Sequence, residues 1–314
     1  MHRRDVLIQT PAAAAAAVLA AAAAATAPAP CAAAEAFGDA EARELRVLRQ
    51  LGGGSYRSVY EVEYTDSLTA TVRRAALSCE VLARNRDVRD AAGELEVFSV
   101  LQSAYGDSPV MQLLEQLDTW WVKRSRVSVG DTLIVPPQSG QRLPTSTRRA
   151  VSLCQLKPLY DFDLRAITKF PPYALGSVPS VRFGGTMLNT EEAAVRMALD
   201  LLLAGECLHN AGVLHRDVGL ANCMVKDGRG VLIDFGLSEV LKPGQMCRDT
   251  LRGQTEYLLP SETARGRGCR GGDVYAMGRT FSETFLDYAP PELHRPRRAM
   301  RADDFGSAKR HAAR

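Results

Sequence analysis

Apolar residues recur along the chain at two spacings, and each spacing predicts a different kind of element. Between residues 191 and 210 they recur at intervals of three and four, which predicts one long helix with an apolar face. We expect that face to consist of Val195, Leu199, Leu202 and Leu203. Gly212 predicts the end of the helix. Short apolar runs at 151–156, 223–225 and 231–233 instead predict buried strands.

The chain before these elements changes character twice. From residue 45 to about residue 101, short β-like runs and a glycine cluster come first and a helical stretch follows. A stretch rich in Pro, Gly and Ser at 136–147 predicts an exposed loop, and we place an insertion at about 102–150.

The first 36 residues differ from the rest in composition. Two arginines, Arg3 and Arg4, precede an alanine-rich run at 12–25, and small residues follow it. This order fits a secretory signal peptide, which would make the protein a secreted one. The alternative is an alanine-rich, low-complexity leader that carries no targeting signal, on a cytoplasmic protein.

Composition and charge narrow the function classes. The chain has 314 residues, 46% hydrophobic and 24% charged, which is enough for a globular core. The 39 basic residues nearly balance the 36 acidic ones. Charge therefore favours neither a nucleic-acid partner nor stable membrane insertion, and we expect neither. The seven cysteines show no close pair or zinc-type spacing and are predicted to be free thiols, with one or two disulfides as the alternative if the chain is secreted.

Candidate chemistry is concentrated between residues 213 and 236. Asp217 follows a short apolar run, Asn222 comes five residues later, and Asp234 ends the strand predicted at 231–233. Asp217 could accept a hydroxyl proton, while Asn222 and Asp234 offer the oxygen ligands that Mg²⁺ prefers. The alternative is that all three are polar residues that cap turns.

The order and spacing of these residues resemble the catalytic loop and metal-binding triplet of the protein kinase family. The loop reads His215-Arg216-Asp217, and the triplet reads Asp234-Phe235-Gly236. Leu51 to Tyr60 resembles that family's glycine-rich loop over ATP. The residues expected to bind the nucleotide there are Gly52, Gly54 and Val59. Taken alone, the segment is equally a flexible hairpin turn.

The resemblance implies an α+β, two-lobed fold with ATP and Mg²⁺ in the cleft between the lobes. A small β-rich lobe is expected at 40–156, a mainly helical and truncated lobe at 157–290, and a basic tail at 291–314. The implied reaction transfers the γ-phosphate of ATP to a Ser or Thr hydroxyl of a protein substrate. Within the family, the insertion and the leader are most similar to the secreted rhoptry kinases of apicomplexan parasites.

Several positions depart from the family pattern. The position of the phosphate-binding lysine holds Arg73, or Arg74 under a one-residue shift. We expect Arg73 to act with Glu94 of the following helix and with Asp217 in catalysis. The alternative for Glu94 is a solvated acidic residue on an amphipathic helix.

Arg57 replaces a loop glycine and either stiffens the loop or adds a cation near phosphate. Gly219 stands where serine/threonine kinases usually carry a lysine. These departures leave two alternatives to an enzyme, which are a pseudokinase that binds a partner and a truncated fragment without function.

Overall fold

The fold is described by a computed structural model over most of the chain after residue 42. The described ranges are 43–53, 57–66, 69–136, 142–145, 150–168, 182–183, 186–187 and 191–285. All of them belong to one of the two units into which the chain divides, residues 38–314. The predicted leader, the predicted basic tail and Gly54 lie outside the described residues.

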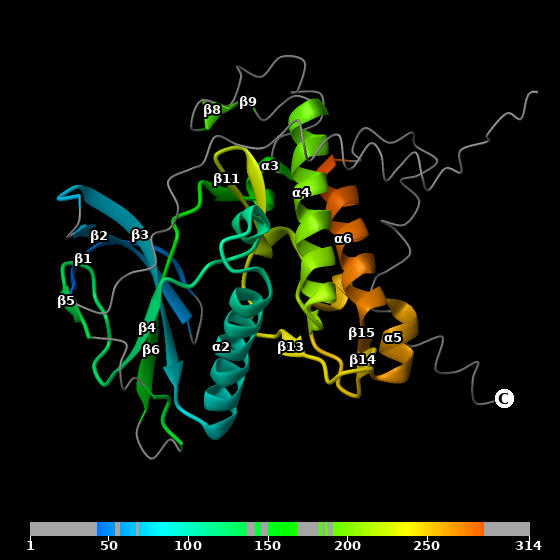
Figure 1. Ribbon diagram of the computed structural model, residues 1–314, viewed down its shortest axis with the longest axis horizontal. Helices are drawn as coiled ribbons and strands as arrows, with labels where there is room; N and C mark the ends of the chain where they lie inside the picture. Colours follow the sequence, from blue (N-terminus) through cyan, green and yellow to red (C-terminus); the bar gives the residue numbers. More distant parts are fainter. Residues whose placement is uncertain are drawn as a thin grey trace, which may run out of the picture. The chain divides into compact units, whose positions relative to one another are not determined.

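A six-stranded antiparallel sheet forms the first part of the described chain (Figure 1). Its order is β4-β6-β3-β2-β1-β5. The strands are β1 (Arg43–Gly53), β2 (Arg57–Thr65), β3 (Val72–Leu82), β4 (Thr119–Lys123), β5 (Thr132–Val135) and β6 (Val151–Lys157). Alternate residues of each strand point to one face, so Leu45 and Val47 of β1 join Val62 and Leu77 in a buried cluster.

Helix α2 (Asn85–Tyr105) follows the sheet strand β3 and packs against it. Asp87 closes its first turn by accepting hydrogen bonds from the backbone N–H groups of Arg84, at 2.8 Å, and Ala83, at 3.1 Å. Its apolar face, which includes Val97, Phe98 and Leu101, belongs to a second cluster shared with the helical part. Helix α2 therefore connects the sheet to the rest of the fold.

The second part of the described chain is mainly helical. Its long helices, α4 (Glu191–Asn210) and α6 (Arg270–Phe285), lie side by side (Figure 1). The shorter helices are η1 (Pro109–Leu113), α3 (Leu164–Thr168), η3 (Leu220–Asn222), η4 (Thr255–Tyr257) and α5 (Pro260–Arg265). The short strands are β7 (Phe162–Asp163), β8 (Arg182–Phe183), β9 (Thr186–Met187), β10 (Val213–Leu214), β11 (Cys223–Lys226), β12 (Arg229–Leu232), β13 (Glu239–Val240), β14 (Cys247–Arg248) and β15 (Gly268–Cys269).

Helix α4 has the predicted bounds, but a different face is buried. Val195 is 52% exposed and Leu202 is 46% exposed, so the predicted face was wrong. The buried side chains are Met197, Asp200, Leu201, Ala204 and Leu208. Asp200 accepts hydrogen bonds from the Arg229 side chain at 2.7 Å and from the Gly230 N–H at 3.0 Å. The packed face of α4 thus includes a buried carboxylate. A prediction from apolar residues alone would place that carboxylate on the solvent side of the helix.

Strands β4 and β5 lie within the stretch that the sequence marked as an insertion. Strand β4 pairs with β6 and its Trp121 is buried, while β5 pairs with β1. Both are therefore part of the sheet. The succession of a sheet and a mainly helical part agrees with the expected α+β class. No helix in the described ranges is long and apolar enough to cross a membrane.

Candidate active site

One carboxylate of α6 binds the backbone of the loop between β10 and η3. Asp273 is 3% exposed, and it accepts hydrogen bonds from the backbone N–H groups of His215 and Arg216, both at 2.8 Å. His209 Nε2 lies 3.0 Å from the same carboxylate. Arg216 has a positive φ of 68°, a conformation that non-glycine residues rarely adopt. The two bonds to Asp273 stabilise this turn, which presents Asp217 on the other side.

Both carboxylate oxygens of Asp217 accept hydrogen bonds from amides. Asn222 Nδ2 donates to Oδ2 at 2.9 Å and also to the Asp217 carbonyl at 2.8 Å. Gln254 Nε2 donates to Oδ1 at 3.2 Å. Burial raises the pKa of Asp217 above its ordinary value, and the negative charge of Asp234 adds to the effect, while the bonds from Gln254 and Asn222 oppose it. The carboxyl group is therefore held in place and made more basic, as a general base requires.

Asp234 follows β12 and lies close enough to Asp217 to repel its charge. Its φ is +67°, and its N–H donates to Glu115 Oε2 at 3.0 Å. Asp234 Oδ1 accepts hydrogen bonds from the Gly236 N–H and from Arg57 Nη1, both at 3.1 Å. The next residue, Phe235, is fully buried, which fixes the strained turn.

Phe235 joins the helix α2 to the catalytic loop. Its ring meets the Phe98 ring edge-on, with centroids 5.3 Å apart, and the His215 ring in the same way at 5.7 Å. Because Phe98 belongs to α2, the position of the metal-binding triplet depends on the position of that helix.

Asn222 and Asp234 suit a magnesium ion that is also bound by phosphate. Asn222 uses its amide nitrogen on Asp217, so the amide oxygen is the atom that it can offer to a cation. Asp234 is 38% exposed, and its Oδ2 takes part in none of the bonds above. Mg²⁺ usually binds one or two carboxylates together with substrate phosphates. The described residues hold no cluster of three or more His, Cys, Asp or Glu side chains that could hold a metal on their own.

A buried ion network lies behind Asp234. Glu94 of α2 is 1% exposed, and its two oxygens accept from Lys157 Nζ at 3.1 Å and from Arg57 Nη2 at 2.8 Å. Lys157, at the end of β6, also pairs with Glu115 at 3.2 Å. Burial by itself would raise the pKa of Glu94, but the charges of Lys157 and Arg57 outweigh burial and lower it to about 2. Glu94 is therefore ionised and fixed, and the alternative of a solvated glutamate is excluded.

The expected pair of Arg73 and Glu94 is not formed, which corrects the sequence-based assignment. Arg73 lies at the start of β3, where its Nε donates to Asp66 at 2.9 Å and its side chain is 43% exposed. Strand β3 begins at Val72, so Arg73 is only its second residue. The residues of β3 that lie near Glu94 come later in the sequence than the family's lysine motif suggested.

Of the three residues expected to bind the nucleotide in that loop, the structure describes two, and these two are neighbours in the sheet. Gly52 of β1 stands opposite Val59 of β2. Val59 in turn stands opposite Ser78 of β3. A Cβ added to Gly52 would meet no atom within 4 Å, so the described structure leaves open space above this position.

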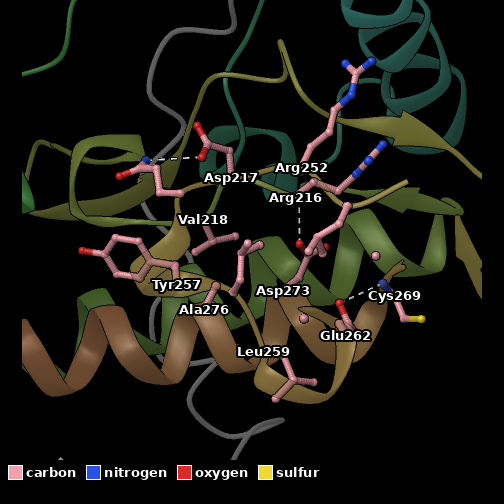
Figure 2. Close-up of a pocket in the computed structure, with 15 residues that line it drawn as sticks. Arg216, Asp217, Val218, Arg252, Tyr257, Leu259, Glu262, Cys269, Asp273 and Ala276 are labelled. Carbon is pink, nitrogen blue, oxygen red and sulfur yellow. Dashed lines mark hydrogen bonds between the residues drawn. The ribbon is translucent and has the colours of Figure 1, made fainter. Parts of the chain in front are cut away.

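A pocket lies between the catalytic loop and the segment that follows the metal-binding triplet. Figure 2 shows Asp217 and Val218 along one side, with Tyr257, Ala276 and Glu262 farther round the wall. The Tyr257 ring packs against Gly219, where an added Cβ would lie 3.1 Å from the ring. Any side chain at residue 219 would therefore press on Tyr257, which gives a physical reason for the absence of a lysine there.

The segment from Ser238 to Glu262 is fixed by covalent and ionic links. Cys247 of β14 and Cys269 of β15 form a disulfide, so the prediction of free thiols was wrong for these two residues. Arg216 binds Glu239 and donates to the Thr250 carbonyl at 2.7 Å and to the Thr250 hydroxyl at 2.9 Å. Arg216 is thus already paired with a carboxylate of this segment.

The residues of the site that were not singled out from the sequence include Glu115, Lys157 and Gln254. Lys157 had one recognisable signal, because a lysine that ends an apolar strand must find a carboxylate when it is buried. Glu115 and Gln254 had no such signal, since each reaches the site only through the folding of its segment.

Comparisons with known proteins place the three candidate residues in a stretch that resembles a protein kinase domain. Residues 181–310 match the model of the protein kinase domain, and the match includes Asp217, Asn222 and Asp234. The chain is 32% identical over 111 residues to the serine/threonine-protein kinase PknA of Nostoc sp., which covers 32% of this chain and 20% of that protein. It is 32% identical over 105 residues to the dual specificity protein kinase shkE of Dictyostelium discoideum, which covers 30% of this chain and 15% of that protein.

A third relative, F31E3.2 of Caenorhabditis elegans, is named as a candidate serine/threonine-protein kinase. It is 29% identical over 153 residues, which cover 44% of this chain and 34% of that protein. The chain therefore spans about a third or less of the length of these curated relatives.

Proposed function

We propose, from matches that support the protein kinase family, that this chain transfers the γ-phosphate of ATP to a Ser or Thr hydroxyl of a protein substrate. The observation that carries the proposal is the state of Asp217. Its two carboxylate oxygens are each held by an amide, and Asp234 lies close enough to act on its charge. A fixed carboxylate beside a metal-binding carboxylate is the arrangement that phosphoryl transfer needs.

Each residue of the site has a distinct task in this reaction. Asp217 accepts the proton of the substrate hydroxyl, and its raised pKa makes it a better acceptor than an ordinary aspartate. Asn222 keeps Asp217 in position and shares the metal site with Asp234. Mg²⁺, when bound there, supplies positive charge to the phosphate oxygens.

The electrostatics of the site favour a divalent cation. The pKa of Glu115 is raised by burial, opposed by Lys157 and reinforced by Glu94 and Asp234. The pKa of Glu80 is raised by burial as well, and Asp234 again contributes. Because Asp234 repels several neighbouring carboxylates, a cation bound to it would relieve that repulsion.

A nucleotide-binding module without transfer is the second candidate function. It is favoured by the position of Arg73, which lies outside the site, and by Gly219, which brings no charge to it. Without these two charges, fewer groups stabilise the transition state. Each lost donor raises the activation free energy by about 2.7–4 kcal/mol.

A transfer assay with matched aspartate variants distinguishes the two candidates. The full chain is incubated with radiolabelled ATP, Mg²⁺ and a generic protein substrate, and Asp217→Asn, Asp234→Asn and the control Asp249→Asn are compared. Asp249 serves as the control because its side chain is 84% exposed and pairs with Arg267, which is not a residue of the site. Transfer by the wild type and the control that is lost in the other two supports the kinase. A Mg-ATP-dependent thermal shift without any transfer supports the module.

Two finer assignments, the likeness to rhoptry kinases and export through the leader, are also proposals. What supports both is the order of basic, alanine-rich and small residues in the first 36 positions. Expression of the full chain in a eukaryotic secretory host tests the leader. A secreted product whose new N-terminus lies near residue 36 supports it, and a cell-retained product that begins at Met1 contradicts it.

A further inference from the structure

The strand β3 brings no cation to the site in the part of the chain that the structure describes. Its only basic residues are Arg73 and Arg74, which pair with Asp66 and Glu61. Arg73 stands opposite Tyr64 of β2, while Glu80 at the other end of β3 stands opposite Arg57. Arg73 and Glu80 are seven positions apart along the strand, or about 23 Å at a rise of about 3.3 Å per residue. Arg73 therefore cannot reach Glu94 without a change in the strand pairing.

Arg57, the first residue of β2, occupies the position between the sheet, α2 and Asp234. Its Nη2 donates to Glu80 at 2.9 Å and to Glu94 at 2.8 Å, and its Nη1 donates to Asp234 at 3.1 Å. Burial alone would lower its pKa, but the three carboxylates outweigh burial and raise it. Arg57 is thus a permanent cation beside the metal-binding aspartate.

Arg57 also has donors to spare. A guanidinium group carries five N–H donors, and the bonds to Glu80, Glu94 and Asp234 use three of them. The side chain remains 24% exposed. Arginine forks match phosphate oxygens in geometry and charge, so the unused donors suit a nucleotide phosphate.

Lys157 does not fit that task. Its side chain is 5% exposed and lies between Glu94 and Glu115, with the Phe98 ring 5.3 Å away. Lys157 donates to Oε1 of Glu94, whereas Arg57 donates to Oε2 and also to Asp234. The two cations therefore have different roles. Lys157 fixes Glu94 from the core, and Arg57 faces the site.

We propose that Arg57, on β2, is the cation that binds the nucleotide phosphates in this chain, and that Glu80 and Glu94 position it. The inference rests on the proposed function only in assuming that the site takes ATP. Arg57, which reaches the site from the neighbouring strand β2, thus has the role that the sequence assigned to Arg73. Glu80 has a positioning role that its place in the sequence did not suggest.

Nucleotide binding by Arg57 variants tests the proposal without relying on turnover. Thermal shifts of the full chain are measured against the concentrations of Mg-ATP and of adenosine, which lacks phosphates. The variants are Arg57→Lys, Arg57→Gln and the control Arg73→Gln, an arginine of the same sheet. We expect Arg57→Gln to weaken Mg-ATP binding at least tenfold with adenosine binding unchanged, Arg57→Lys to retain part of the affinity, and Arg73→Gln to behave as the wild type.

Removal of Arg57 leaves three carboxylates together, so a second variant guards against loss of the fold. Arg57→Gln combined with Glu80→Gln removes one of those charges, and its melting curve shows whether it is folded. The folded double variant should show the same selective loss of Mg-ATP binding.

Four results would overturn the proposal. They are an equal loss of ATP and adenosine binding in Arg57→Gln, unchanged ATP affinity in that variant, a comparable loss in Arg73→Gln, and no binding of Mg-ATP by the wild type. If the wild type binds Mg-ATP through Arg57 but transfers no phosphate, the proposed kinase function fails and the assignment of Arg57 stands.

Discussion

Gln254 donates a hydrogen bond to Asp217, with 3.2 Å between the Gln254 Nε2 and the Asp217 Oδ1. The bond joins the candidate base to a segment that is closed by the disulfide between Cys247 and Cys269. The state of that segment therefore reaches the candidate base directly through Gln254, beside the bonds that Arg216 makes to Thr250.

Removal of this bond should change the pH dependence of transfer. The bond from Gln254 lowers the pKa of Asp217, whereas burial raises it, so Gln254→Ala should raise the pKa further. Because the base works only when it is deprotonated, activity is lost as the pH falls through this pKa, and the acid limb should move to higher pH. The pH profile of kcat checks this, with Gln245→Ala as the control. An acid limb that stays in place would contradict the role of Gln254.

Asp273 should be important for stability as well as for activity. Asp273→Asn keeps the shape of the side chain but weakens two bonds to buried backbone N–H groups. Hydrogen bonds to charged groups contribute about 1.5–3 kcal/mol each, so we expect a loss of at least about 1.5 kcal/mol in the free energy of unfolding. Urea unfolding measures it, and the exposed control Asp249→Asn should change it by less than about 0.5 kcal/mol. Equal effects of the two variants would refute the anchoring role.

Lys157 should be among the costliest side chains to remove. Lys157→Met leaves Glu94 and Glu115 buried without one of their cations, which costs about 3–5 kcal/mol. The control is Arg46→Met, because Arg46 is 66% exposed and its pair with Glu63 contributes at most about 1 kcal/mol.

A second substitution separates charge from packing in the Lys157 prediction. Lys157→Met combined with Glu115→Gln removes the carboxylate that was left without a cation, so urea unfolding should show part of the stability restored. No recovery in the double variant would mean that packing of the lysine chain, and not its charge, accounts for the loss.

The disulfide should contribute to stability and to transfer. It joins residues 22 positions apart, and closing a loop of that length contributes about 3 kcal/mol in the chain-entropy model. Cys247→Ser with Cys269→Ser, or reduction of the wild type, should lower Tm and kcat together, because Gln254 lies in the closed loop. The control is Cys207→Ser, which removes a thiol that forms no disulfide. A wild type whose Tm ignores reductant would show that the bridge is not formed in solution.

The local parts of the site could be predicted from the sequence. Asp217, Asn222 and Asp234 lie within 18 residues of one another on a loop and a hairpin. Turn residues and short apolar runs specify such an arrangement without help from the rest of the chain. The bounds of α4 and the placement of Glu94 on a helix were predictable for the same reason.

The assignment of the cation failed because strand register is a long-range property. The motif placed a phosphate-binding residue at Arg73, but the pairing of β2 with β3 sets Arg57 opposite Glu80 and leaves Arg73 near Asp66. A shift along a strand moves a side chain by about 3.3 Å per residue, and no local pattern in β3 reports its partner.

The sequence by itself determined which side chains the loop at 213–236 brings together, since residues that are close in the chain need only local turns to converge. The tertiary structure alone decided which cations serve that loop. Arg57 meets Asp234 across 177 positions and Glu94 across 37, and Lys157 meets Glu94 across 63. Buried charges must be paired, but which partners they find depends on how the sheet, α2 and the catalytic loop pack together.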